Sequence, residues 1–227
     1  MSVILETKKL TKTYKSNEVQ VEVLKGIDLT IEAGDFLSIR GASGVGKSTL
    51  LNILGALDRA DSGDIIVAGK SLNSYFSEDN LHLYRRDKVG FIFQNHYLMS
   101  DFTVLENVMM PLLIKKQSRK EAEETAMDVL KSVGLEDRAK HFPSQISGGE
   151  SQRAAVARAI IHKPPIVLAD EPTGNLDTKN SEKFIDIFAN LQQERNLTIL
   201  VVTHDMNLAD KAFHKYKLYD GLLFTVD

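Results

Sequence analysis

The sequence predicts an α/β fold with a parallel-sheet core, a smaller antiparallel β subdomain and an inserted α-helical subdomain. Two apolar runs, 166–169 and 197–202, have the near-continuous hydrophobicity of strands buried on both faces of a parallel sheet. A strand-like segment at 36–40 precedes a glycine-rich turn and a helical pattern from residue 48, which is the order of a βα unit. Apolar residues between 122 and 133 recur at helical spacing, and they indicate the helical insert.

The antiparallel piece and the domain count follow from the first part of the chain. Strand patterns around 21–24 and 65–67 are separated by turn residues, which favours short antiparallel strands beside the parallel sheet. No linker rich in Pro, Gly or Ser divides the 227 residues. We therefore expect one domain over residues 1–227.

The limits of the helical insert follow from helix start and stop signals. Ser118 opens a capping-box pattern, and Gly134 stands where the C-cap of that helix is expected. A second helix is expected to run from about residue 149 to 160. The helical subdomain should therefore cover roughly residues 95–160, between strands of the core.

Composition excludes several kinds of protein. The chain has no cysteine, which rules out a disulfide framework and thiolate metal sites. Its 28 Lys and Arg against 31 Asp and Glu give a net charge of −3, which argues against a dedicated nucleic-acid binder. The N-terminus lacks the apolar stretch of a signal peptide, and no run approaches a membrane span. We expect a cytoplasmic chain that reaches a membrane only by binding another chain.

A phosphate-binding loop is the most specific motif. Residues 41–48 match G-x-x-x-x-G-K-[ST] and lie between an expected strand and helix, which is the context the motif needs. Its glycines let the backbone turn its N–H groups inward, and the helix N-terminus favours an anion. Lys47 supplies a charge for the β- and γ-phosphates, and Ser48 offers a hydroxyl to Mg²⁺. The predicted nucleotide-binding residues of this segment are Gly41, Ala42, Ser43, Gly44, Val45, Gly46, Lys47, Ser48 and Thr49.

Two carboxylates follow the apolar strand at 166–169. Strand ends of open α/β sheets line the ligand crevice, so Asp170 is predicted to hold Mg²⁺ there. Successive strand residues point to opposite sides, and Glu171 is therefore expected to point elsewhere and to act on the attacking water. The alternative interpretation is an acidic turn before Pro172, which the upstream phosphate loop makes less favourable.

Ser147-Gly148-Gly149-Glu150 stands about 100 residues after the phosphate loop and just before the acid pair. With these motifs the whole chain resembles the nucleotide-binding subunit of ABC transporters, whose signature is Leu-Ser-Gly-Gly-Gln; here Ile146 and Glu150 replace the first and last residues. The resemblance implies a P-loop NTPase (RecA-like) core that hydrolyses ATP with Mg²⁺. It also implies that two copies sandwich two ATP molecules head to tail. Ser147, Gly148 and Gly149 would then face the γ-phosphate bound by the partner.

The resemblance assigns four further residues. Gln94 matches the residue that touches Mg²⁺ and the attacking water, so the predicted metal ligands are Ser48, Gln94 and Asp170. His204 matches the switch histidine at the γ-phosphate, and it joins Glu171 and Gln94 as predicted catalytic residues. Asp177 matches the loop that links the two halves of the dimer. Tyr14 matches the aromatic that stacks on adenine, and such stacking selects weakly among bases.

A finer resemblance concerns the kind of transporter. Residues 101–114, 168–177 and 201–205 are similar to the lipoprotein-releasing (Lol-type) ATPases, and Tyr219-Asp220-Gly221 fits the final hairpin of that family. This implies a peripheral ATPase on the cytoplasmic face of the inner membrane. Its partner would be a permease of four-helix type with a large extracytoplasmic domain. Mac-type efflux ATPases and the cell-division ATPase belong to the same wider group and remain alternatives.

Two other classes are less favoured. Soluble ABC ATPases of translation or DNA repair usually carry two cassettes or long coiled-coil insertions, and this chain has one phosphate loop and no heptad tract. A regulator that binds ATP without hydrolysis is opposed by Glu171 and His204. Among the apolar residues near Gln94, Phe91 and Phe93 are expected in the core of the helical insert. The segment 97–102 is expected to form a groove for a helix of the partner.

Overall fold

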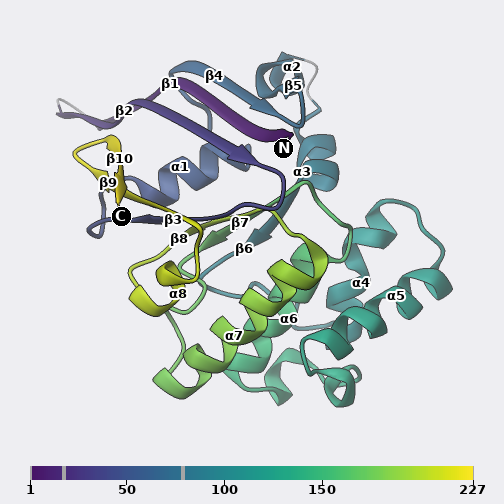
Figure 1. The fold of residues 1–227 in the computed structure, drawn as a ribbon. Helices are drawn as coiled ribbons and strands as arrows, with labels where there is room; N and C mark the ends of the chain where they lie inside the picture. The colour runs from purple at the N-terminus through teal and green to yellow at the C-terminus, as the bar shows by residue number, and fades with distance from the viewer. Residues whose placement is uncertain (1, 17–18, 78–79, 227) are drawn as a thin grey trace.

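The structure, a computed structural model of the chain, describes residues 2–16, 19–77 and 80–226. An antiparallel sheet lies above a larger sheet in Figure 1, and helices cover the opposite side of the larger sheet. The antiparallel sheet has the strand order β2-β1-β4-β5. Its strands are β1 (Val3–Ser16), β2 (Val19–Glu32), β4 (Ser62–Val67) and β5 (Lys70–Ser71).

The larger sheet has the order β10-β9-β3-β8-β7-β6. Parallel pairing joins β9, β3, β8, β7 and β6, and β10 alone runs antiparallel to its neighbour within the described sheet. The predicted parallel-sheet core with an antiparallel β subdomain is confirmed. The strands are β3 (Phe36–Arg40), β6 (Val89–Ile92), β7 (Ile166–Asp170), β8 (Ile199–Val202), β9 (His214–Tyr219) and β10 (Leu222–Val226).

Helices lie on both faces of the larger sheet. The helices are α1 (Lys47–Leu54), α2 (Leu72–Ser77), α3 (Leu81–Lys88), α4 (Val104–Ile114), α5 (Arg119–Ser132), α6 (Gly148–Ile160), α7 (Thr178–Arg195) and α8 (Met206–Asp210), with 3₁₀ turns at Glu136–Arg138 and Pro143–Gln145. The helices α4 to α6 all lie between β6 and β7, as the predicted helical insert requires. In the described part of the chain, none of these helices is long and apolar enough to span a bilayer.

Two hydrophobic cores hold these layers together. In one core, Leu50 of α1 is buried together with Leu24 of β2 and Leu200 of β8. The helix α1 therefore lies between the two sheets. The other core joins the opposite face of the larger sheet to α4 to α7, through side chains such as Val201 and Phe188. Because α1 is buried between the sheets, the loop at its N-terminus is held on a rigid support.

Local sequence signals set most helix ends, with small differences. Ser118 caps α5 by accepting a hydrogen bond from the backbone N–H of Glu121. The C-cap of α5 is Val133, and Gly134 lies one residue beyond it with φ +65°, where glycine relieves the strain of a left-handed residue. The last helix of the insert begins at Gly148, one residue earlier than expected. The strand expected over 197–202 begins at Ile199.

Candidate active site

A cavity of about 650 Å³ opens where β3, β7 and β8 end. The residues that line it are Tyr14, Val23, Gly41, Ser43, Gly44, Gly46, Lys47, Ser48, Thr49, Gln94, Glu171 and His204. They come from segments far apart in the sequence, which the parallel sheet brings to one edge, as expected for an open α/β sheet.

The phosphate loop has the backbone that its glycines predict. Gly44 and Gly46 have φ of +77° and +108°, conformations that other residues adopt at a cost. The helix α1 begins directly after Gly46 at Lys47, so its N-terminal N–H groups face the cavity that the loop encloses. The Lys47 ammonium is nearly buried and donates hydrogen bonds to the carbonyl oxygens of Gly41 (2.9 Å) and Ala42 (3.0 Å). The loop therefore provides a cation and helix N–H groups for an anion.

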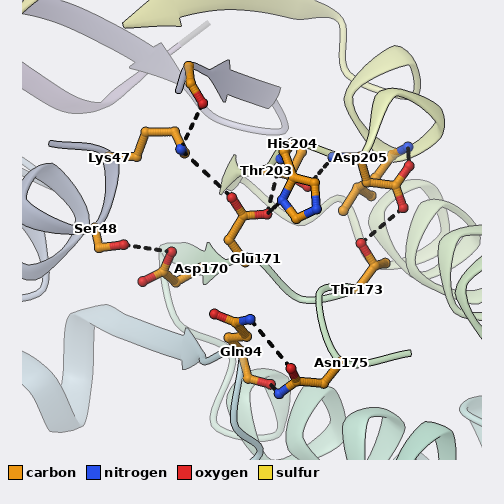
Figure 2. A network of polar contacts seen from close by, with 12 residues as sticks. Lys47, Ser48, Gln94, Asp170, Glu171, Thr173, Asn175, Thr203, His204 and Asp205 are labelled. Carbon is orange, nitrogen blue, oxygen red and sulfur yellow. Dashed lines mark hydrogen bonds and ion pairs between the residues drawn. The ribbon is translucent and has the colours of Figure 1, made fainter. Parts of the chain in front are cut away.

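Ser48 and Asp170 form an oxygen-rich pair beside this loop. The Ser48 hydroxyl donates to Asp170 Oδ1 at 3.1 Å, as Figure 2 shows. Burial raises the pKa of Asp170 against the lowering effect of that hydrogen bond, and the charge of Glu171 raises it further. A hydroxyl and a carboxylate are ligands that suit Mg²⁺, which takes few protein ligands and completes its shell with water and phosphate oxygens. The described residues contain no cluster of three His, Cys, Asp or Glu side chains that could hold a metal ion.

Glu171 lies between Lys47 and His204. One carboxylate oxygen is 3.8 Å from Lys47 Nζ, and the other accepts hydrogen bonds from His204 Nδ1 (2.8 Å) and the His204 backbone N–H (3.0 Å). Asp170 and Glu171 do point to different partners, but strand alternation is not the reason. The strand β7 ends at Asp170, and Glu171 adopts a left-handed backbone with φ +43°. Such a conformation costs free energy for a non-glycine residue and is typical of functional sites.

Gln94 reaches the cavity from the segment after β6. Its side chain lies near Asn175, with 3.4 Å between Gln94 Nε2 and Asn175 Oδ1. The Asn175 amide also donates to the carbonyl oxygen of Gln94 (3.1 Å) and to Asn95 Oδ1 (2.9 Å). Asn175 therefore fixes the backbone at Gln94, a role that the sequence motifs did not reveal.

A second link joins the loops that follow β7 and β8. Thr173 Oγ1 donates to Asp205 Oδ2 at 3.0 Å, and Ser181 Oγ donates to the same oxygen. Asp205 also caps α8, where it accepts from the backbone N–H groups of Asn207 and Leu208. This network holds the His204 segment in place relative to Glu171, and sequence reasoning missed it because it joins residues 32 positions apart.

Tyr14 and Val23 form the rim on the antiparallel sheet. Tyr14 lies on β1 and is 44% exposed, and Val23 lies on the neighbouring strand β2. Sequence reasoning missed Val23, because only the pairing of β1 with β2 brings it beside Tyr14. The β1–β2 pair thus places an aromatic ring on the cavity rim and an aliphatic side chain against Gly46 of the phosphate loop.

Several predicted residues lie outside the cavity lining. Ala42 contributes its carbonyl oxygen to Lys47, and the half-buried Val45 side chain packs against the core around α1. Ser147 caps α6 in a capping box with Glu150, and the backbone N–H of Ser147 lowers the pKa of Glu150 to about 2. Asp177 caps α7. The structure therefore separates Ser147, Gly148, Gly149 and Asp177 from the nucleotide cavity of the same chain.

The surroundings of Phe91 and Phe93 correct an expectation. They do not fill the core of the helical insert; their rings stack at 4.2 Å between centroids and line a surface groove with Tyr97. The reason is strand alternation, because Ile92 between them is fully buried and turns both neighbours to the other face of β6. The expectation that the two rings fill the core of the helical insert was wrong, because they lie on the opposite face of β6.

The chain matches a family model described as "ABC transporter" over residues 24–174. It is 46% identical to the lipoprotein-releasing system ATP-binding protein LolD of Legionella pneumophila (strain Paris), over 98% of each chain. It is also 46% identical to LolD of Cytophaga hutchinsonii, over 98% of this chain and all of the relative.

Solved structures agree with this assignment. The dimeric structure of MJ0796, a bacterial ABC transporter cassette, has a TM-score of 0.87 and 43% identity, covering 97% of this chain and 96% of that one. A post-hydrolysis state of the same cassette bound to ADP and Pi has a TM-score of 0.88 and 41% identity, covering 99% of both. The predicted P-loop NTPase fold is confirmed, and the chain belongs to the ABC transporter family as an ATP-hydrolysing cassette of the Lol type.

Proposed function

We propose that the chain is the ATPase subunit of a complex that releases lipoproteins from the inner membrane. The observation that carries this is the 46% identity with two LolD proteins over nearly the whole length of each chain. In this proposal the chain is held on the cytoplasmic face of the membrane by a permease of four-helix type. ATP binding brings two copies of the chain together as a closed dimer, and this closure moves the permease.

The site residues act on ATP and its attacking water. Lys47 and the N–H groups at the start of α1 hold the β- and γ-phosphates, which requires Lys47 to exchange the carbonyls of Gly41 and Ala42 for phosphate oxygens. Ser48, Asp170 and Gln94 hold Mg²⁺, which supplies charge stabilisation for the phosphoryl group when bound. Glu171 orients the attacking water and accepts its proton.

His204 has a defined proton position. A carboxylate only accepts, so His204 Nδ1 carries the hydrogen that it donates to Glu171. The other ring nitrogen, Nε2, is then the atom through which His204 would contact a γ-phosphate. The Glu171–His204 pair therefore links the base to the group that senses the γ-phosphate.

The complete site needs a second copy of the chain. Ser147, Gly148 and Gly149 stand at the N-terminus of α6, outside the nucleotide cavity of their own chain. In a head-to-tail dimer this helix end faces the γ-phosphate bound by the partner, and Asp177 lies in the loop that connects the two halves. The similarity to dimeric cassette structures supports this arrangement.

The groove beside β6 is the proposed contact with the permease. It has a volume of about 540 Å³, and Phe91, Phe93, Tyr97, Pro111 and Ile114 supply its apolar surface. Tyr97 is 65% exposed and Ile114 is 56% exposed, so a large apolar area is open to solvent. Such a groove fits the apolar face of a partner helix.

Reconstitution tests the lipoprotein proposal directly. The chain, co-expressed with a permease of the Lol type, is placed in liposomes that hold a lipoprotein, and ATP is added. We expect lipoprotein to leave the liposomes only with ATP and only with the intact complex. Export of a small molecule without lipoprotein release would favour the Mac-type alternative. Co-purification with ribosomes or DNA in place of a permease would support a soluble ATPase and overturn the proposal.

A charge in the groove should separate the chain from its permease. Tyr97→Asp places a carboxylate among apolar side chains that a partner helix must cover, so co-purification with the permease should fall at least about 10-fold, the scale of burying one unpaired charge. Tyr219→Asp is the matched control, because Tyr219 is 64% exposed on β9. Thermal unfolding of both variants checks that they fold. Equal recovery of permease with both variants would exclude the groove as the contact.

A further inference from the structure

Tyr14 is tied to a carboxylate that no motif includes. Its hydroxyl donates a hydrogen bond of 2.7 Å to Asp58 Oδ2, from β1 to the loop that follows α1. We propose that Asp58 is a positioning residue, which fixes the Tyr14 ring in the orientation that stacks on the nucleotide base. This inference rests on the proposed nucleotide-binding role of Tyr14.

Both oxygens of Asp58 are engaged. Oδ2 accepts from Tyr14, while Oδ1 accepts from Lys12 Nζ at 2.8 Å and from the backbone N–H of Arg59 at 2.7 Å. Burial acts to raise the pKa of Asp58, but the hydrogen bonds from Lys12, Tyr14 and Arg59 outweigh it and leave the pKa below its usual value. Asp58 is therefore a charged acceptor with a fixed orientation.

Lys12 adds a second restraint on the ring. Its side chain is only 11% exposed, and its ammonium also donates to the carbonyl oxygen of Arg59 at 2.7 Å. The same ammonium lies 4.9 Å from the centroid of the Tyr14 ring, within the range of a cation–π interaction. Asp58 thus holds Tyr14 at its hydroxyl end and Lys12 holds it at its face, while the residue stays 44% exposed and lines the cavity.

The same contact fixes the distance between base and phosphates. Asp58 lies just past the C-terminal end of α1, where the N–H groups of Leu57 and Asp58 both donate to the carbonyl oxygen of Asn52. The phosphate loop lies at the other end of this eight-residue helix, which is about 12 Å long. Through Asp58, Tyr14 is therefore held at a fixed position relative to α1, the helix proposed to bind the phosphates, although Tyr14 itself lies in the antiparallel sheet. Such preorganisation lowers the entropic cost of binding.

Two nucleotide probes test the positioning role. We compare ATP with inorganic tripolyphosphate, which binds the phosphate loop but has no base to stack. Asp58→Asn leaves one acceptor oxygen where the carboxylate has two, and Tyr14→Phe removes the donor. Each should weaken ATP binding about 3- to 10-fold, the scale of one ordinary hydrogen bond. Titration calorimetry should find tripolyphosphate affinity unchanged in both, because the phosphate loop is intact.

A double variant separates positioning from a merely structural role. In the Tyr14→Phe background, Asp58→Asn should weaken ATP binding by less than about 2-fold, because its partner is already absent. Asp28→Asn is the matched control, since Asp28 on β2 pairs with Lys9 on β1, the strand of Tyr14, and is exposed outside the cavity lining. It should leave both affinities unchanged.

The outcomes distinguish this inference from the role of Tyr14 itself. Tyr14→Ala should weaken ATP binding and spare tripolyphosphate; unchanged ATP affinity would remove Tyr14 from the base site. If Tyr14→Ala weakens ATP binding while Asp58→Asn and Tyr14→Phe do not, Tyr14 stacks without help and the positioning role of Asp58 is wrong. An equal loss of ATP and tripolyphosphate affinity in Asp58→Asn would make Asp58 a structural residue of the α1 loop.

Discussion

Replacing Glu171 by Gln should lower the turnover number for ATP hydrolysis by a factor of roughly 10² or more, the contribution of a general base. The amide keeps the shape of the side chain and can still accept from the His204 backbone N–H, which lies 3.0 Å from Glu171 Oε2. It cannot accept a proton from water. ATP binding should therefore persist, because Lys47 and the start of α1 are unchanged.

The same variant should trap the closed dimer. With hydrolysis blocked, ATP and Mg²⁺ should shift Glu171→Gln to about twice the monomer mass in size exclusion, while the parent chain stays mostly monomeric. Glu182→Gln, an acid-to-amide change on α7 outside the nucleotide cavity, should hydrolyse ATP and elute like the parent. Parental hydrolysis by Glu171→Gln would disprove the general-base role, and a mutant that stays monomeric at high concentration would contradict the head-to-tail dimer.

Replacing Lys47 by Ala should weaken ATP binding at least about 100-fold, since it removes a charge-assisted contact to the phosphates from a nearly buried position. The carbonyl oxygens of Gly41 and Ala42 would also lose their donor, and this leaves acceptor groups facing the incoming phosphates. Titration calorimetry with ATP measures the loss directly. Tripolyphosphate should be affected equally, because the contact is to phosphate and not to the base.

A surface lysine provides the comparison. Lys120→Ala, on the exposed side of α5, should bind ATP like the parent chain. Thermal unfolding distinguishes lost binding from lost folding in Lys47→Ala. Parental ATP affinity in a folded Lys47→Ala variant would assign the phosphates to a different part of the cavity.

Features that depend on neighbouring residues could be predicted from the sequence. The phosphate loop is one, because Gly44 and Gly46 permit its left-handed backbone and the helix follows within the same stretch of chain. The buried strands β7 and β8 are others, since both faces of a central parallel strand must be apolar. The cap at Ser118 depends on a partner three residues away. In each case the sequence signal that indicates the feature is contained in one short segment of the chain.

Pairings across long sequence separations could not be predicted in this way. The contact between Tyr14 and Asp58, the support of Gln94 by Asn175 and the link from Thr173 to Asp205 join residues 32 to 81 positions apart. Polar side chains of these kinds occur on any protein surface, so composition and periodicity do not indicate which of them meet. The side of β6 on which Phe91 and Phe93 lie was likewise open, because both sides of that strand are apolar in sequence.

The chemistry proposed for the site can be predicted from the sequence alone: a cation and helix N-terminus for phosphates, a hydroxyl and carboxylate for Mg²⁺, and a second carboxylate for water. The tertiary structure alone decided how these groups are aimed. The parallel sheet brings the ends of β3, β7 and β8 to one edge, the left-handed backbone at Glu171 turns its carboxylate toward Lys47 and His204, and the β1–β2 pair carries Tyr14 and Val23 to the rim. The physical reason is that direction depends on strand order, register and packing between distant segments, whereas the kind of chemistry depends on which side chains are present.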